Sequence, residues 1–391
     1  MTRYLLALLL VWSTAAATSP PVGAAGIVPS PPRVAATAYL LVDADSGAVL
    51  AEHNADEQLP PASLTKMMTS YLLAREIAEG RLQESDMVAI SENAWSQNPV
   101  FNGSSLMWIE PGKDVSVGDL QRGIIISSGN DATVAVAEHI AGSEAVFAEM
   151  MNATAQSLGM HDTYYTNSHG LPDPDLVTTA RDLATLSAAM IRDYPEQYAI
   201  YAEKEFTYNN IRQYNRNTLM NEDPSVDGLK TGYTSEAGYC LVASAERNGM
   251  RLISVVMGTT STRARKNETR SLLNYGFRFF ETSTVMQPGA ELERPRIWQG
   301  EVDHLSVGLA DGAVLTLPRG RADDIVTTVQ VDEDLIAPLE EGDRVGTVTL
   351  TLDDETVFSA PLAALEPVAA GGFFARLWDR VLMWFAGLFR A

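Results

Sequence analysis

The periodicity of the apolar residues changes at about residue 283, and this change limits the folds open to the chain more than any other feature. Before it, amphipathic segments with helical spacing alternate with strand-like runs. After Pro288 the segments are strand-like, and Gly and Asp separate them up to about residue 360. A length of 391 residues also exceeds the usual size of one domain. We therefore expect a first domain at residues 35–283 and a smaller β-rich domain at 288–366.

The first domain is expected to be of the α/β (α+β) class, with an antiparallel sheet that has helices on both sides. Residues 38–56 and 239–258 each read as a β-hairpin, the second turning at Arg247-Asn248-Gly249. Residues 91–116 read as a long loop. The predicted helices are 61–74, 115–142 with a break at 127–130, 144–160, 178–195 with Thr178 or Thr179 as N-cap, and 271–282. In the second domain, the candidate strands are 314–318, 325–331 and 345–353.

Residues 1–25 are predicted to be a secretory signal peptide. Arg3 precedes a short apolar run, and small residues with A-x-A-type sites follow near Ala17 and Ala25. The apolar run is too short to span a membrane as a helix.

The chain has one cysteine, Cys240, so no intramolecular disulfide can form. The apolar neighbours of Cys240 favour a buried structural thiol.

The C-terminal segment 371–391 is predicted to be an amphipathic helix. Phe, Trp and Leu fill most of its surface, and charges such as Arg376 and Asp379 interrupt the apolar run. This pattern is typical of a helix that lies in the membrane interface rather than one that spans it. The alternative is a helix packed on the body of the protein.

The net charge of -22 argues against a nucleic-acid partner and against broad attraction to anionic membranes.

Ser63 and Lys66 stand three residues apart, where the helix of residues 61–74 is expected to begin. Ser is a common N-cap, so the pair also fits a capped helix followed by a solvated lysine. Two further motifs favour chemistry: S-G-N at 128–130 and K-T-G at 230–232. S-x-x-K, S-x-N and K-T-G in this order are the signature of penicillin-recognising serine enzymes. The ordered set in an exported chain indicates a catalytic serine.

The spacing of Ser63 and Lys66 suits a nucleophile and its base. A serine hydroxyl reacts well only when a base removes its proton. Lys66 lies nearly one helical turn beyond Ser63 on the same face. Its amine can be the base only when neutral, and burial or a nearby cation would lower its usual pKa of about 10.4. We therefore expect Ser63 to form an acyl ester and Lys66 to be the base.

With these motifs the chain resembles the low-molecular-mass penicillin-binding proteins, the serine-type D-alanyl-D-alanine carboxypeptidases of the peptidase S11 family. Residues 168–175, 226–245 and 277–282 also look like that family, and the resemblance covers roughly residues 35–391. It implies a β-lactamase/transpeptidase-like first domain. It also implies removal of the terminal D-alanine from peptidoglycan pentapeptides, with β-lactams as covalent inhibitors and a part in wall remodelling and cell shape. The expected location is the periplasmic face of the inner membrane, held by the C-terminal helix.

The resemblance also implies roles for the other motif residues. Lys230 would lower the pKa of Lys66 and, with Thr231, bind the terminal carboxylate of the substrate. Ser128 would relay a proton to the departing D-alanine, and Asn130 would hold the substrate backbone and Lys66.

Four more residues are assigned in the same way. Gly232 would leave room for substrate beside the K-T-G strand. The backbone N–H groups of Ser63 and Tyr233 would hold the oxyanion. Arg216 and Arg265 match family arginines near the substrate, although a surface arginine is nearly as good an interpretation for each. We expect no metal and no cofactor, and a structural role for His169.

The sequence leaves three other functions open. A β-lactamase needs a deacylating group, commonly Glu, but residues 168–182 offer only Asp173, Asp175 and Asp182. A non-catalytic wall-binding protein would be expected to have a broken motif, and all the motif residues are present. An endopeptidase that cleaves crosslinks would use the same site.

Overall fold

The computed structural model describes the backbone of residues 28–390 and the side chains of 28–385. The predicted signal peptide, residues 1–25, lies outside the described residues. A five-stranded antiparallel sheet with the order β2-β1-β9-β8-β7 organises the first part of the chain. Its strands are β1 (Ala38–Asp43), β2 (Val49–His53), β7 (Val226–Thr234), β8 (Gly238–Arg247) and β9 (Met250–Thr259).

Both predicted hairpins are confirmed. In the second, Arg247 pairs with Met250 across a two-residue turn, in which Asn248 and Gly249 have φ of 53° and 78°. Positive φ at both turn positions matches the right-handed twist of the two strands, and Asn-Gly tolerates it best. The long strands β8 and β9 that follow from this turn form the centre of the sheet.

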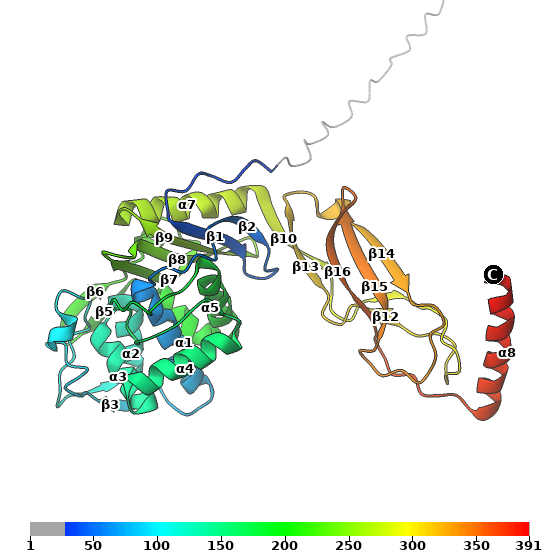
Figure 1. Cartoon of the computed structure of the whole chain (residues 1–391), viewed down its shortest axis with the longest axis horizontal. Helices are drawn as coiled ribbons and strands as arrows, with labels where there is room; N and C mark the ends of the chain where they lie inside the picture. Colours follow the sequence, from blue (N-terminus) through cyan, green and yellow to red (C-terminus); the bar gives the residue numbers. More distant parts are fainter. Residues whose placement is uncertain (1–27, 391) are drawn as a thin grey trace, which may run out of the picture.

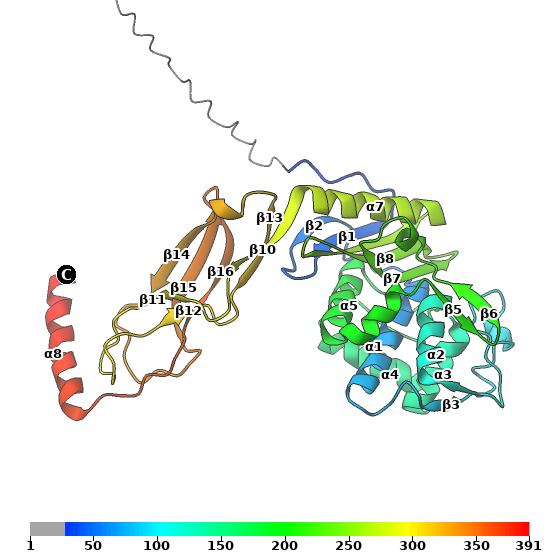
Figure 2. The ribbon, with the colours of Figure 1, turned by 180° about the vertical axis from the view of Figure 1, so that it is seen from behind.

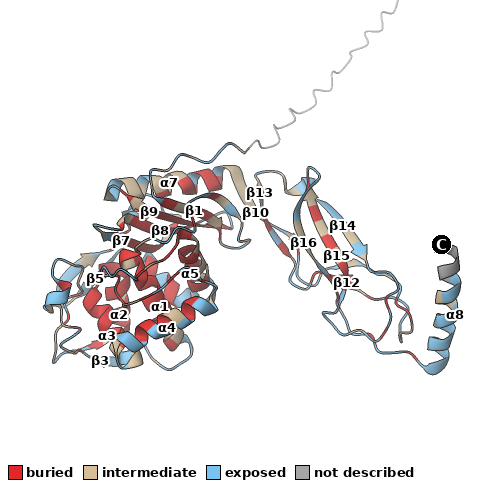
Figure 3. Cartoon of the chain, viewed as in Figure 1, coloured by how far each residue is buried: buried red, intermediate tan, exposed pale blue. Residues whose placement is uncertain are grey.

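Helices cover both faces of this sheet, as expected (Figures 1 and 2). Helix α7 (Thr262–Phe279) lies on one face, where Leu272, Leu273 and Phe277 pack on apolar strand residues. The opposite face carries the larger core, which includes residues of α1 (Lys66–Ala78) and α5 (Ala180–Asp193). Figure 3 shows the buried residues concentrated in the sheet and in α1 and α5, whereas α7 has a large exposed side.

The described residues of the first part of the chain contain four further α-helices. They are α2 (Val117–Arg122), α3 (Asn130–Ala141), α4 (Glu144–Ser157) and α6 (Pro195–Tyr198). The predicted helix, break and helix over 115–142 is confirmed, and Thr179 rather than Thr178 caps α5 by accepting the N–H of Asp182. Two small sheets were not predicted: β3 (Met87–Ala89) with β4 (Asp114–Ser116), and β5 (Glu205–Tyr208) with β6 (Ile211–Tyr214).

Helix α7 differs from its prediction at both ends. It begins at Thr262, where Ser261 caps it by accepting the N–H of Ala264, nine residues before the expected start. Residues 262–270 are too rich in charge for an apolar stripe to reveal the first turns. Residues 280–282 were predicted as helix but belong to β10 (Phe280–Met286), because that strand pairs with β13 (Ala313–Pro318).

The second part of the chain is β-rich. A five-stranded sheet has the order β11-β12-β16-β15-β14, and its core is separate from that of the first part. The three predicted strands correspond to β13, β14 (Val326–Val331) and β15 (Arg344–Leu352). The strands not predicted are β10, β11 (Glu291–Glu293), β12 (Val307–Gly308) and β16 (Glu355–Ala364). Since β10 pairs only within this second part, we propose that the second domain begins near Phe280 rather than at 288.

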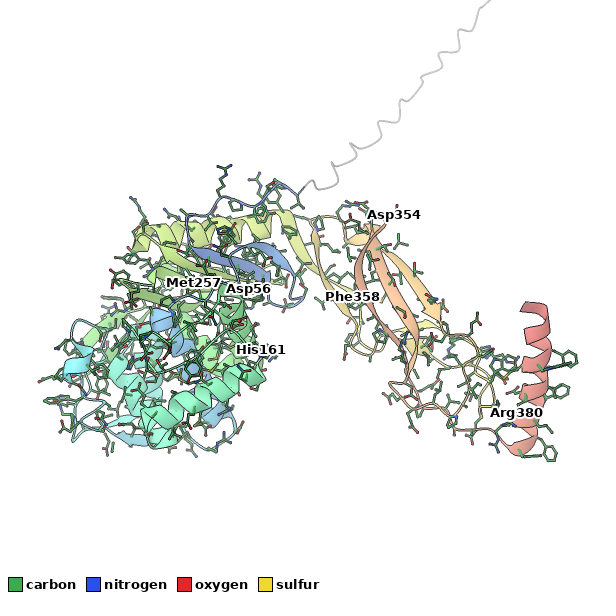
Figure 4. All side chains as sticks on the ribbon, viewed as in Figure 1. Asp56, His161, Met257, Asp354, Phe358 and Arg380 are labelled. Carbon is green, nitrogen blue, oxygen red and sulfur yellow. The ribbon has the colours of Figure 1, made fainter. Side chains whose placement is uncertain are left out.

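Hydrogen bonds join the two parts at the turn of the first hairpin. The buried carboxylate of Asp43 accepts from the hydroxyls of Thr282 and Thr316, and Ser46 contacts Thr316. Figure 4 places Met257 in the central sheet and Phe358 in the second sheet, on either side of this joint.

Helix α8 (Phe373–Arg390) ends the chain, as the sequence predicts. Its described apolar side chains are largely exposed; for example, Phe374 is 82% and Trp384 65% exposed. Its contact with the β-rich part includes Asp379, which accepts the backbone N–H of Gln299 at 2.6 Å. Within residues 28–390, no helix has the length and apolar character needed to cross a membrane.

Candidate active site

Ser63 lies in a short 3₁₀ helix, Ala62–Thr65, that leads directly into α1. Its neighbours Ala62 and Leu64 are buried, whereas Ser63 is partly exposed. The N-cap position of the short helix is Pro61 and that of α1 is Thr65. The alternative interpretation of Ser63 as a helix cap is therefore wrong, and its hydroxyl is free for other chemistry.

Lys66 is the first residue of α1 and is only 1% exposed. Its Nζ donates to Ser63 Oγ at 3.1 Å and to Asn130 Oδ1 at 2.6 Å. A third hydrogen bond goes to the backbone carbonyl of His169. The alternative interpretation of Lys66 as a solvated lysine is thus wrong as well. The oxygens of Asn130 and His169 hold its amine beside the Ser63 hydroxyl.

Burial lowers the pKa of Lys66 to about 7, and the positive charge of Arg216 adds to this effect. The resemblance implies Lys230 as the cation that lowers this pKa, but in the structure that effect comes from Arg216. The pKa of Lys230 is itself well below its usual value, because of burial and then of Lys66. Burial and Arg216 thus make a neutral Lys66 accessible near neutral pH.

The S-G-N motif forms the break before α3. Ser128 has a left-handed backbone with φ of 59°, and its Oγ accepts from Lys230 Nζ at 2.9 Å. A Cβ on Gly129 would lie 2.8 Å from the carboxylate of Asp131. That buried carboxylate accepts the N–H groups of residues 107–109 and so fixes a loop beside the motif.

The K-T-G motif lies on β7, at the edge of the sheet. A Cβ on Gly232 would lie 3.0 Å from the carbonyl oxygen of Pro61, so this glycine permits the close approach of β7 to the Ser63 segment. Arg265, from α7, donates to the carbonyl of Gly232 at 3.0 Å. The ring of Tyr233 stacks on that of Tyr239, with the centroids 4.2 Å apart.

A cavity of about 380 Å³ joins these elements. Eight of the ten predicted site residues line it: Ser63, Ser128, Asn130, Arg216, Thr231, Gly232, Tyr233 and Arg265. The other two, Lys66 and Lys230, are buried behind it and hydrogen bond to Ser63 and Ser128. The structure thus brings together residues that span more than half of the sequence.

Other contributors were missed from the sequence. Ser104 and Ser105 line the cavity from the segment 91–116, for which the sequence predicts only a loop. His169 contributes its carbonyl, while burial and the charge of Lys66 lower the pKa of its imidazole to about 3, so the ring stays neutral. Gly170 has φ of 86°, and a Cβ there would lie 1.9 Å from the carbonyl oxygen of Ala62. The family-like stretch 168–175 marks the segment of His169 and Gly170, but their roles could not be predicted because each acts through a tertiary contact.

Cys240 is buried, as predicted, and burial raises the pKa of its thiol to about 11. A thiol with such a pKa is a poor nucleophile. Within residues 28–385, no group of His, Cys, Asp and Glu side chains is arranged to hold a metal ion.

Comparison with known proteins gives two family matches. Residues 26–261 match the D-alanyl-D-alanine carboxypeptidase family, peptidase S11. Residues 280–370 match the C-terminal domain of penicillin-binding protein 5. The chain is 46% identical over 365 residues to D-alanyl-D-alanine carboxypeptidase DacC of Escherichia coli, covering 92% of this chain and 91% of the relative.

Solved structures agree with these matches. Penicillin-binding protein 5 from Haemophilus influenzae superposes with a TM-score of 0.84 at 44% identity, covering 87% of this chain and 99% of that one. Penicillin-binding protein D2 from Listeria monocytogenes, in its cefotaxime-bound form, superposes with a TM-score of 0.58 at 30% identity. That match covers 64% of this chain and 100% of the other.

Proposed function

This chain belongs to the D-alanyl-D-alanine carboxypeptidase family of peptidase S11, and we propose that it removes the terminal D-alanine from peptidoglycan stem pentapeptides through an acyl-enzyme on Ser63. The observation that carries the proposal is the 3.1 Å contact between Lys66 Nζ and Ser63 Oγ at the base of the cleft. Such activity serves peptidoglycan remodelling and, by the resemblance, the maintenance of cell shape.

In the proposed acylation step, neutral Lys66 takes the proton of Ser63 Oγ as the oxygen attacks the carbonyl carbon of the penultimate D-alanine. The negative charge that forms on the carbonyl oxygen is held by the backbone N–H groups of Ser63 and Tyr233. Asn130 keeps the lysine amine in place through its Oδ1.

Substrate recognition rests on the free edge of β7. The stem peptide lies along this edge, with its terminal carboxylate at Thr231 and close to Lys230 and Arg265. Arg216 adds positive charge at the same end of the cleft. Cations and a hydroxyl at one end of the cleft favour a substrate with a free terminal carboxylate.

Ser128 and Lys230 serve the leaving group. The contact of 2.9 Å between them supports a relay that delivers a proton to the nitrogen of the departing D-alanine. Water then attacks the acyl ester and frees Ser63 for the next cycle. β-Lactams present a strained amide to the same serine, and we propose that they acylate it; the cefotaxime-bound relative supports this.

The environment of Glu144 favours this function over a β-lactamase. This residue of α4 approaches the segment 168–169, but its Oε1 accepts both the N–H and the hydroxyl of Ser168. It does not line the cavity. A glutamate held in this way is poorly placed to activate a deacylating water.

Release of D-alanine from a soluble pentapeptide tests the proposed function. We expect the mature chain to release one D-alanine per peptide, to leave the tetrapeptide product uncut and to be labelled by fluorescent penicillin. Penicillin labelling without D-alanine release would instead favour an endopeptidase or a wall-binding protein. Rapid turnover of penicillin would favour a β-lactamase.

We also propose that the chain is exported and held at the periplasmic face of the inner membrane by α8. The exposed apolar side chains of this helix, among them Trp378 and Trp384, support the proposal. A chain that ends at Ala370 should appear in the soluble exported fraction, whereas the full chain should sediment with membranes. The soluble-pentapeptide activity of the shortened chain should be unchanged, because α8 makes no part of the cavity. Sedimentation of the shortened chain with membranes would contradict the proposed anchor.

A further inference from the structure

A second cavity, of about 320 Å³, adjoins the catalytic cleft. It lies between the edge strand β7, the segment 217–219 and the first turn of α7. The two cavities share the lining residues Arg216, Thr231, Thr262 and Arg265. The proposed binding position of the substrate carboxylate is therefore part of the wall between them.

The second cavity is strongly basic, although the whole chain carries a net charge of -22. Arg216, Arg263, Arg265 and Lys266 line it, and none of its described lining residues is acidic. Lys266 is balanced by an ion pair with Glu222. Arg216 and Arg265 donate to backbone carbonyl groups, which carry no net charge to balance them. Such a cluster of cations in a partly enclosed space attracts an anion.

Apolar groups complete the lining of this cavity. Leu219 and Leu241 lie beside the arginines, so the space suits a short aliphatic chain that ends in a negative charge. When a substrate places its terminal carboxylate at Thr231, the side chain of the substrate's last residue begins next to the opening of the second cavity. For D-alanine this side chain is a methyl group, which leaves the second cavity unfilled.

We propose that the second cavity is a subsite for an anionic side chain of the leaving residue, so that the enzyme also removes terminal D-amino acids with a side-chain carboxylate. The inference rests on the proposed function and extends its range of substrates. The reaction is unchanged: the amide bond breaks, the acyl group passes to Ser63, and the D-amino acid leaves with its nitrogen protonated.

Three peptides that differ only in the last residue test the subsite: D-alanine, D-glutamate and D-glutamine. D-Glutamine has nearly the same shape as D-glutamate without the charge. We expect kcat/KM for D-glutamate to exceed that for D-glutamine by about fivefold, the size of a partly exposed charge interaction. Release of D-alanine in the same assay reports on the proposed function by itself.

The variant Arg263→Ala tests whether the second cavity causes this preference, because Arg263 lines the second cavity and not the catalytic cleft. We expect this variant to lower the ratio between D-glutamate and D-glutamine without abolishing it, because Arg216 and Arg265 still line the cavity. Arg278→Ala, at the other end of α7 and outside the cavity, is the matched control and should keep the ratio. A wild-type ratio of one or less would overturn the proposal, and so would a high ratio that Arg263→Ala leaves unchanged.

Discussion

Replacing Ser63 by alanine should abolish both D-alanine release and labelling by fluorescent penicillin. The expected loss in kcat is on the order of 10⁴-fold or more, as for other enzymes that lose a nucleophilic serine. The physical reason is that Ser63 Oγ is the hydroxyl that contacts the buried amine of Lys66. Without it no acyl ester can form, however well the peptide binds along β7.

Two controls separate this loss from a loss of structure. Ser63 is partly exposed, so its truncation leaves no core cavity, and the thermal unfolding temperature should change little. Ser70→Ala is the matched variant: Ser70 is buried on the same helix and does not line the cleft. It should keep penicillin labelling. Persistent labelling of Ser63→Ala would show that another residue is the nucleophile.

The fold could be predicted where local patterns were strong. The Asn248-Gly249 turn, the capped helix α5 and the break at 127–130 each carry their own signal, and all three are confirmed. The prediction was wrong where pairing partners decide the structure. Residues 280–282 continue the apolar spacing of α7, but their backbone pairs with β13, more than thirty residues further along the chain. Single-sequence periodicity contains no information about such a partner.

In the candidate site, too, some contributions could be predicted from the sequence and others could not. The motif residues could be found because acyl transfer demands particular side chains at fixed spacings. The backbone carbonyl of His169, the fit of Gly170 against Ala62 and the serines of the loop at 104–105 could not be found. They contribute through backbone atoms and tertiary contacts, which cannot be predicted from the residue type alone. The carboxylate of Asp131, which fixes that loop, is likewise recognisable only once its three N–H partners are seen.

Lys66→Ala should lower kcat/KM for the pentapeptide by about 10³-fold, which is typical of a lost general base. Lys66→Arg should be nearly as inactive, because a guanidinium stays protonated at every relevant pH. This second variant keeps a cation beside Asn130, so it separates loss of the base from loss of a positive charge. Activity retained in Lys66→Arg would show that the lysine is needed only for its charge.

The pH profile of acylation provides the sharper test of the same role. Burial and Arg216 lower the pKa of Lys66 to about 7, and only the neutral amine can accept the serine proton. The wild-type rate should therefore rise about tenfold from pH 6 to pH 8 and then level off, whereas an unperturbed lysine would give a rise near pH 10.

Removing a nearby cation and removing a nearby anion should shift the inflection of this pH profile in opposite directions. Arg216→Gln removes a cation that lowers the pKa, so the inflection should move to higher pH; Glu144→Gln removes an anion that raises it, so the inflection should move to lower pH. An inflection that stays in place in both variants would mean that the titrating group is not Lys66.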